Sequence, residues 1–219
     1  MIPLEVLFLD NHLLAANKPP GLLTQPSGRE EENLESFSKT WLKEKYKKAG
    51  NVFLEAVHRI DRPVGGIVLF SRTSKSLSRL QESVRKRDVR KIYYALVEGE
   101  FLEERGVLED YLVHDRFCSR VALKRERRAK LSRLQYRTLG RRQGKTLLEI
   151  SLDTGRYHQI RIQFSRRGYP ILGDAKYGAK GSWNFPGIAL HHQRMEIPHP
   201  ISKEIQRIES FPSWIGDWP

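Results

Sequence analysis

Two segments of the sequence combine charged side chains, histidine and glycine next to apolar runs. In the first, residues 58–66, Asp61 stands between Arg59 and Arg62, just before a glycine pair that lets another chain or a ligand approach the backbone closely. The segment therefore offers one carboxylate between two guanidinium groups. A structural salt bridge on an ordinary turn is the alternative interpretation of the same charged triplet.

The second segment, residues 154–161, lies where an expected strand ends and an expected helix begins. Arg156 and Arg161 bracket His158 and Gln159 there, close to the helix N-terminus, where unpaired backbone N–H groups favour anions. Together the two segments suit chemistry on an anionic substrate, with one carboxylate and several arginines.

Other chemical motifs are incomplete, so we expect neither a cofactor nor a metal ion. Residues 140–146 are similar to a phosphate-binding loop, but they have three residues between the glycines instead of four and lead into a strand. His191 and His192 are adjacent, so on a strand they point to opposite faces and cannot share a metal ion. Cys118 lies among cations, and we interpret it as a lone surface thiol.

The charge of the chain points to a polyanionic partner. The 219 residues contain 39 Lys and Arg against 26 Asp and Glu, a net charge of +13, which favours nucleic acid. Residues 116–142 alone hold eleven basic residues against one acid, interleaved with Phe117, Leu123 and Tyr136. A solvated charged face is the alternative, but the nearly single sign of the charge favours a surface that follows the phosphates of a nucleic acid.

The composition also indicates the compartment. A single cysteine fits a reducing environment, and the N-terminus lacks the basic and apolar regions of a secretory leader. No stretch approaches about 18 apolar residues, the length that a membrane-spanning helix needs. We therefore predict a cytoplasmic protein without a membrane partner.

The hydrophobic pattern predicts strands and helices without a regular βαβ rhythm, which is typical of the α+β class. A hairpin is expected first, and the tail from Pro198 is expected to be mostly irregular. Thr73 or Ser74 is expected to cap the second helix. The predicted strands are 4–9, 13–17, 66–71, 91–98, 146–153 and 188–197, and the predicted helices are 32–49, the segment around Leu77, Leu80 and Val84, and 157–167.

Four segments follow the order and approximate spacing of one family's signatures. They are LLAANKPPGLLTQPSG at 13–28, HRIDRPVGGIVLFSRT at 58–73, KIYYALVEG at 91–99 and LDTGRYHQIRIQFSRRGYPILGDAKYG at 152–178. These segments resemble the signatures of RluA-type pseudouridine synthases, over most of residues 4–197. One departure is Val64-Gly65, which stands where the family usually has Thr-Ser.

The resemblance implies a pseudouridine-synthase fold, with a mixed, mainly antiparallel central sheet flanked by short helices and loops. We expect residues 1–219 to form a single catalytic domain, with a basic arm or hairpin at 116–142. The first signature begins almost at Met1, so the small N-terminal RNA-binding domain of some members is expected to be absent. Recognition of the substrate would then depend on the catalytic domain itself.

The implied reaction is the isomerisation of a specific uridine in structured RNA, either rRNA or tRNA, to pseudouridine without cofactor or metal. By motif position Asp61 is the catalytic aspartate, and Arg161 is the partner that stabilises its charge. Tyr93 would stack on the uracil and handle the proton at C5. The nucleotide must be flipped out of the folded RNA, and Arg59 would fill the vacated stack.

The expected partner is the RNA, and we predict a monomer with no obligate protein partner. The predicted RNA-binding residues are Arg59, Arg62, Lys91, Arg156, His158, Arg125, Arg127, Arg128 and Lys130. A non-catalytic RNA-binding or RNA-folding factor on the same scaffold is the main alternative, and it would not need Asp61. A nuclease or N-glycosylase is less suitable, because no second carboxylate or metal cluster accompanies that residue in the sequence.

Overall fold

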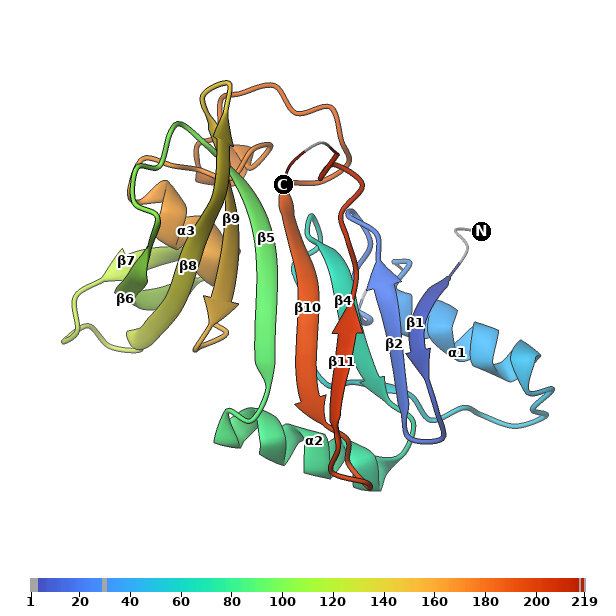
Figure 1. Cartoon of the computed structure of the whole chain (residues 1–219). Helices are drawn as coiled ribbons and strands as arrows, with labels where there is room; N and C mark the ends of the chain where they lie inside the picture. The colour runs from blue at the N-terminus through green and yellow to red at the C-terminus, as the bar shows by residue number, and fades with distance from the viewer. Residues whose placement is uncertain (1–3, 29–30, 217, 219) are drawn as a thin grey trace. The chain divides into compact units, whose positions relative to one another are not determined.

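The computed structural model describes residues 4–28, 31–216 and 218, and the chain divides into two compact units (Figure 1). The first unit comprises Met1–Lys91 and His192–Pro212, and the second comprises Ile92–His191 and Ser213–Pro219. All strand pairings with a described register are antiparallel, and the helices are short. The predicted α+β class is confirmed.

In the first unit, β4 is central, with β2 and β10 as its neighbours. β1 pairs with β2, β11 pairs with β10, and β3 adds a short pairing to β4. The elements are β1 (Glu5–Leu9), β2 (Leu13–Lys18), α1 (Leu34–Lys45), β3 (Glu55–Ala56), β4 (Gly65–Ser71), α2 (Ser74–Lys86), β10 (Leu190–Pro198) and β11 (Ile205–Glu209).

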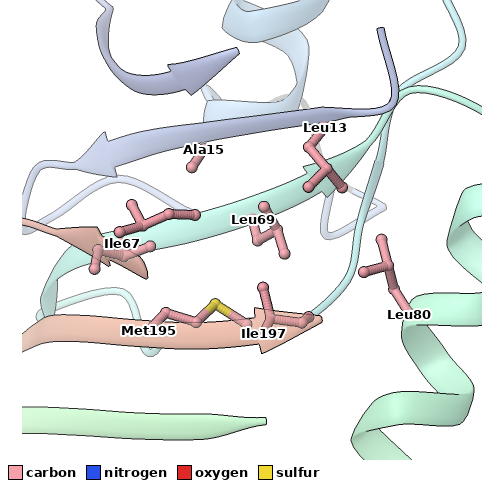
Figure 2. Packing of buried hydrophobic residues seen from close by; sticks show 8 residues of the cluster. Leu13, Ala15, Ile67, Leu69, Leu80, Met195 and Ile197 are labelled. Atoms are coloured by element: carbon pink, nitrogen blue, oxygen red, sulfur yellow. The ribbon is translucent and has the colours of Figure 1, made fainter. Parts of the chain in front are cut away.

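The core of the first unit gathers side chains from four strands and one helix (Figure 2). Leu80 of α2 extends toward side chains of β2, β4 and β10, and all of these are fully buried. Burial removes about 1.5–3 kcal/mol of unfavourable hydration for each large apolar side chain, so this cluster fixes α2 on the sheet. The clustered residues are Leu13, Ala15, Ile67, Leu69, Leu80, Met195, Ile197 and Ile208.

Both long helices of the first unit begin at a side-chain cap. The carboxamide oxygen of Asn33 accepts a hydrogen bond from the Ser36 N–H of α1 at 2.9 Å. The Thr73 hydroxyl accepts one from the Ser76 N–H of α2 at 3.1 Å, which confirms one of the two predicted caps. Such caps contribute about 1 kcal/mol each, and they set the first residue of each helix.

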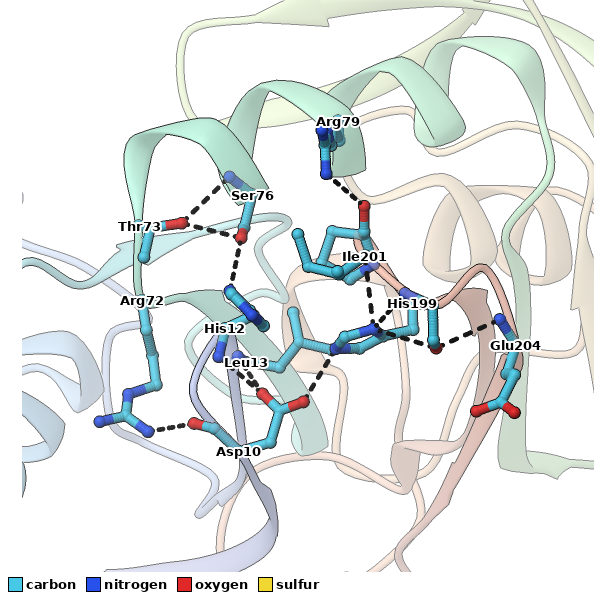
Figure 3. Close-up of polar contacts among 12 residues, drawn as sticks. Asp10, His12, Leu13, Arg72, Thr73, Ser76, Arg79, His199, Ile201 and Glu204 are labelled. Carbon is cyan, nitrogen blue, oxygen red and sulfur yellow. Dashed lines mark hydrogen bonds and ion pairs between the residues drawn. The ribbon is translucent and has the colours of Figure 1, made fainter.

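A polar network connects the two hairpin turns of the first unit to the start of α2 (Figure 3). His199 Nε2 lies 2.8 Å from Asp10 Oδ2, while its Nδ1 accepts the Ser202 N–H at 3.1 Å. Asp10 Oδ1 also accepts the backbone N–H groups of His12 and Leu13 at 2.7 Å. Burial raises the pKa of Asp10, but these hydrogen bonds and the nearby His199 outweigh it and lower the pKa.

In the second unit the strands follow the order β5-β9-β8-β6-β7. Along β8, Ser132, Leu134, Tyr136 and Thr138 are buried and alternate with exposed residues, because one face of the strand packs on the interior. α3 lies against β6 and β7. The elements are β5 (Arg90–Glu98), β6 (Arg105–Asp115), β7 (Cys118–Ala122), β8 (Lys130–Arg142), β9 (Lys145–Leu152), α3 (Gln159–Ser165) and a 3-10 turn, η1 (Ala175–Tyr177).

The β8–β9 turn explains why residues 140–146 do not form a phosphate-binding loop. Gln143 and Gly144, the two residues between the strands, both have positive φ, 52° and 66°. That combination is typical of a two-residue turn whose twist matches the flanking strands. The glycine therefore serves the hairpin.

Most predicted elements are confirmed within a few residues. β3, β6 and β11 were not predicted, and β11 lies in the tail that was expected to be mostly irregular. β7 and β8 lie in the segment expected to form a basic arm or hairpin, and each of them pairs with β6. β11 shows little apolar alternation, since only Ile208 of its five residues is buried. The third helix starts at Gln159 rather than Tyr157, because His158 before it has a left-handed φ of 53°.

Candidate active site

Asp61 lies in a tight turn that leads into β4. The Val64 N–H donates to the Asp61 carbonyl at 3.0 Å, and the Arg62 carbonyl accepts the Gly21 N–H at 2.8 Å. One residue before the aspartate, the Ile60 carbonyl accepts the Thr24 hydroxyl at 3.1 Å. The turn is therefore fixed on both sides of Asp61 by residues of the 18–24 loop.

The side chain of Lys18 connects the 18–24 loop to the Asp61 turn. This side chain is fully buried, and the ammonium donates to the carbonyls of Pro19 at 3.0 Å, Leu22 at 2.8 Å and Arg62 at 3.1 Å. Burial lowers the pKa of Lys18 to about 7, while the charge of Asp61 opposes that shift. A cation at this position would stabilise the Asp61 carboxylate electrostatically.

The glycine pair after Asp61 permits the close backbone approach that the sequence predicted. Gly66 has φ of +110°, and a Cβ built on it would lie 2.4 Å from the His192 carbonyl oxygen. No other residue type fits this position without a shift of the backbone. The neighbouring chain is β10 of the same unit, so the pair serves the packing of β4.

His58, at the start of the same signature, is a half-buried neutral imidazole. Its Nε2 accepts the Leu69 N–H at 3.2 Å, and its ring meets the ring of His192 edge to face at 5.2 Å. Burial, together with the charge of Lys91 and the nearby His192, holds the pKa of His58 well below its usual range. Burial also lowers the pKa of Lys91.

In the second unit, Arg161 forms a buried two-point ion pair that the sequence analysis missed. Its Nε lies 2.7 Å from Asp174 Oδ2 and its Nη2 lies 2.8 Å from Asp174 Oδ1. The two side chains are only 5% and 1% exposed. This fork-to-fork geometry holds the guanidinium plane in one orientation. The available sequence signal was the GDAKYG end of the third signature, to which no role was assigned.

Tyr177 holds the other side of the same guanidinium. The guanidinium carbon of Arg161, Cζ, lies 4.9 Å from the centre of the Tyr177 ring. The Tyr177 hydroxyl is 2.8 Å from His158 Nδ1. The hydroxyl also accepts the Ser119 N–H of β7 at 2.8 Å. Burial raises the pKa of Tyr177 to about 12 and lowers the pKa of His158 to about 3, so both are neutral at physiological pH.

The beginning of the third signature supports the start of α3. Gln159 Oε1 accepts the Arg156 N–H at 3.0 Å and the Thr154 hydroxyl at 2.8 Å. The guanidinium of Arg156 donates to the Leu131 carbonyl at 3.1 Å and is exposed. Gln159 therefore acts as a structural clamp, while Arg156 keeps an accessible cationic side chain.

The residues of the predicted signatures divide between the two units. The first unit contains Asp61, Arg59, Arg62 and Lys91, and the second contains Tyr93, Arg156, His158 and Arg161. Arg59 is exposed, and Arg62 donates to the Gly21 carbonyl and pairs with Glu31 at 3.1 Å. Tyr93 is buried on β5 opposite Ile150. The predicted contact of Asp61 with Arg161 joins residues of the two units and stays a prediction.

The basic segment 116–142 spans a turn, β7, a connection and β8. Its C-terminal part, β8, is a paired strand with buried side chains. The four cations singled out from the sequence lie at or just before the start of that strand, and all are exposed: Arg125, Arg127, Arg128 and Lys130.

The described residues contain neither a metal-binding cluster nor a membrane-spanning helix. No group of three or more His, Cys, Asp and Glu side chains in this part of the chain is placed to hold a metal ion. None of the helices described here has the length and apolarity to cross a membrane.

Comparison with known sequences identifies the family. The sequence profile described as RNA pseudouridylate synthase matches residues 12–166, which include the Asp61 turn, β5 and all of α3. The chain belongs to the RNA pseudouridylate synthase family. The predicted family and its isomerase class are thereby confirmed.

Several curated pseudouridine synthases are similar over nearly the whole chain. The chain is 28% identical to the uncharacterized RNA pseudouridine synthase YhcT of Bacillus subtilis, covering 96% of this chain and 69% of the relative. It is 33% identical to ribosomal large subunit pseudouridine synthase D of Nitrosomonas europaea, spanning 62% of that protein. It is 32% identical to the dual-specificity RNA pseudouridine synthase RluA of Yersinia pestis, spanning 92% of that protein.

Solved structures of pseudouridylate synthase domains share the fold. Human RNA pseudouridylate synthase domain containing 4 superposes with a TM-score of 0.79, at 22% identity and over 95% of this chain. Human RNA pseudouridylate synthase domain containing 1 superposes with a TM-score of 0.75, at 18% identity and over 96% of this chain. The predicted pseudouridine-synthase fold is confirmed.

Proposed function

We propose that the chain, acting as a monomeric catalytic domain over residues 1–219, isomerises a uridine in structured rRNA or tRNA to pseudouridine, with Asp61 as the catalytic carboxylate. The observation that carries the assignment of Asp61 is its turn. The turn is fixed by four backbone carbonyl contacts, and the buried Lys18 ammonium faces it. An ordinary surface salt bridge needs no such rigid support.

The proposed reaction conserves all atoms of the nucleotide. The N1–C1′ bond breaks, the uracil rotates within the site, and a C5–C1′ bond forms. The hydrogen on C5 then leaves as a proton, and N1 carries a proton in the product. The enzyme needs a group that handles the reactive C1′ or a sugar proton, and a group that removes the C5 proton.

Asp61 fills the first role in this proposal. As an anion it either attacks the sugar or removes a sugar proton, and both routes need the charged carboxylate. Arg161 is proposed to stabilise that charge. Its guanidinium is already oriented by Asp174 and Tyr177, so little side-chain entropy is lost when it binds a further anion.

Tyr93 fills the second role. It lies on a paired strand, so its ring is held rigidly. A tyrosine can stack on a uracil and, as its phenolate, accept the C5 proton. Because a base within folded RNA is inaccessible, the nucleotide is proposed to flip out. The exposed Arg59 would then occupy the vacated stack with its planar guanidinium.

Two other predicted RNA contacts differ in how accessible they are. Arg156 keeps an exposed cationic side chain beside α3, as phosphate binding requires. His158 is buried and neutral, and its described contacts are with Tyr157 and Tyr177. We therefore propose that His158 supports the Tyr177 hydroxyl. Its direct RNA contact stays a prediction.

The names of the relatives indicate which RNA classes to test as substrates. The Nitrosomonas europaea relative is named for the large ribosomal subunit, and the Yersinia pestis relative is named as dual-specificity. The proposal for this chain includes both RNA classes.

The experiment is to incubate the purified chain with rRNA and tRNA that carry tritium at C5 of uridine. Isomerisation releases this tritium to water, and the modified site is then located by pseudouridine mapping of cellular RNA with and without the gene. Tritium release together with one mapped site lost on deletion is the expected result. RNA binding without any tritium release would instead support the non-catalytic RNA-binding factor.

A further inference from the structure

The connection between β7 and β8, residues 123–129, is an ordered loop within the most basic part of the chain. Two backbone hydrogen bonds shape it: the Glu126 N–H donates to the Leu123 carbonyl at 2.9 Å, and the Ala129 N–H donates to the Glu126 carbonyl at 3.1 Å. The two turns share Glu126. Arg128, within the second turn, has a left-handed φ of 68°.

Glu126 is the only acid among residues 116–142, and its carboxylate faces the loop's own groups. Oε1 accepts the Leu123 N–H at 2.7 Å, and Oε2 lies 2.8 Å from the Arg120 guanidinium. The pKa of Glu126 is lowered, first by the Arg120 hydrogen bond and then by the Leu123 N–H. One carboxylate therefore ties the loop to the preceding strand β7.

The contacts of Glu126 are with Leu123 and Arg120, so four neighbouring cations have no described ion pair. Arg125, Arg127, Arg128 and Lys130 are exposed, and none of the ion pairs found among the described residues includes them. Four unpaired cations within six residues repel each other. A flexible loop would relieve that repulsion by spreading, whereas this loop is held closed.

Strand β7, which leads into this loop, is anchored near its N-terminal end to the Arg161 cluster. The Ser119 N–H donates to the Tyr177 hydroxyl, and the Ser119 hydroxyl donates to the Tyr157 carbonyl at 2.5 Å. At the β6–β7 turn, the Phe117 carbonyl accepts the Lys176 ammonium at 3.0 Å, and the Phe117 ring is 76% exposed. The loop thus has a rigid support within the second unit.

We propose that residues 123–130 form a docking loop for the phosphate backbone of RNA, and that Glu126 is the positioning residue that orders it. The proposal rests on the proposed function, since it concerns how the same RNA is bound. Cations that are already ordered lose less entropy when phosphates bind, and displacement of the RNA's counterions supplies the favourable free energy. The exposed Phe117 ring adds a surface on which an unpaired base can stack.

The test removes the negative charge of Glu126, because an effect through charge and an effect through loop order change RNA affinity in opposite directions. Glu126→Ala and Glu126→Gln remove a negative charge from a cationic surface, so charge alone would tighten RNA binding. Loss of the ordered loop would weaken it. Each phosphate contact is worth about five-fold in affinity near 0.15 M salt, so we expect fluorescein-labelled tRNA to bind about 3–10-fold more weakly to Glu126→Ala. Glu126→Gln retains one acceptor oxygen, so its RNA affinity should lie between that of Glu126→Ala and that of the wild type.

The quadruple variant Arg125→Gln, Arg127→Gln, Arg128→Gln and Lys130→Gln tests the cations themselves. We expect the slope of log affinity against log salt to become shallower by up to about 3, from four lost contacts. The matched control is Glu82→Gln, which removes an exposed acid paired with Lys86 at 2.8 Å on α2 and should leave RNA affinity unchanged. Thermal unfolding of each variant establishes that the chain is folded.

The outcomes separate this proposal from the proposed function. Unchanged or tighter RNA binding by a folded Glu126→Ala or Glu126→Gln overturns the positioning role. An unchanged slope of RNA affinity against salt in the quadruple variant overturns the RNA docking loop. If that variant also loses binding to phosphatidylserine vesicles, the loop binds a membrane surface instead of RNA. Tritium release by the wild type is scored separately. If it fails while the binding effects are found, the docking loop stands and the catalytic proposal falls.

Discussion

The Arg161–Asp174 ion pair should dominate the stability of the second unit's polar interior. We consider Asp174→Asn, which keeps the size of the side chain and removes its charge. In the variant, the two hydrogen bonds from Arg161, of 2.7 and 2.8 Å, no longer end on a charged carboxylate. Because both side chains are at most 5% exposed, the small values measured for surface ion pairs do not apply.

The expected loss follows from this burial. Removing one partner of a buried ion pair costs about 3–5 kcal/mol, since a buried charge is left less compensated. For a chain of this size each kcal/mol corresponds to roughly 2–4 °C in the unfolding midpoint, so we expect a fall of about 6–20 °C. The reoriented guanidinium should also reduce turnover, while RNA affinity changes less.

The assay is thermal unfolding followed by circular dichroism, together with tritium release at saturating RNA. The matched control is Glu109→Gln, which removes an exposed acid 3.1 Å from Arg133 in the same unit and should cost less than about 1 kcal/mol. An Asp174→Asn variant that unfolds within 2 °C of the wild type, as the control should, would refute the argument from burial.

Three further predictions concern the first unit. Gly66→Ala places a Cβ 2.4 Å from the His192 carbonyl at φ +110°, so it should lose about 2–5 kcal/mol in urea unfolding, and an unchanged midpoint would contradict the packing argument. The lowered pKa of Asp10 means that its charge stabilises the fold above pH 4 and that this is lost as pH falls through the folded pKa. Asp10→Asn should therefore flatten the decline in urea midpoint between pH 5 and 2, and an equally steep decline would rule out this role. With a folded pKa of about 7, Lys18 binds fewer protons in the folded state above that pH, so stability should rise from pH 7 to 9 in the wild type. Lys18→Met should abolish that rise and reduce turnover more than RNA affinity, whereas a persistent rise would show that Lys18 is not its source.

Elements whose signals are local could be predicted from the sequence. The first hairpin, the buried strand β4 and the Thr73 cap each depend on neighbouring residues. β11 depends instead on pairing with β10, and its own five residues carry little apolar pattern. Its pairing partner, rather than its composition, makes it a strand.

The site follows the same division. The motif position of Asp61 could be read along the chain, and so could the glycine pair with its close backbone approach. The burial of Lys18 could not, because one of its three acceptors is the carbonyl of Arg62, 44 residues away. Lysine is ordinarily exposed, and only the cage of carbonyls makes its burial tolerable.

The partner of Arg161 shows a further difficulty. A guanidinium that starts a helix can pair with any carboxylate that the fold brings near, and the sequence analysis considered only Asp61. The fold places Asp174 there, 13 residues further along. The two aspartates are not exclusive, since an arginine presents five N–H groups and can bind more than one acceptor.

The central claim is that the Asp61 carboxylate carries out the chemistry and contributes little to RNA binding. Its most direct test is tritium release from C5-tritiated RNA by Asp61→Asn, measured beside RNA affinity and thermal unfolding. The account predicts a folded variant with affinity within a few-fold of the wild type, because phosphate contacts dominate binding, and no detectable release. Release at the wild-type rate would contradict the assignment of Asp61.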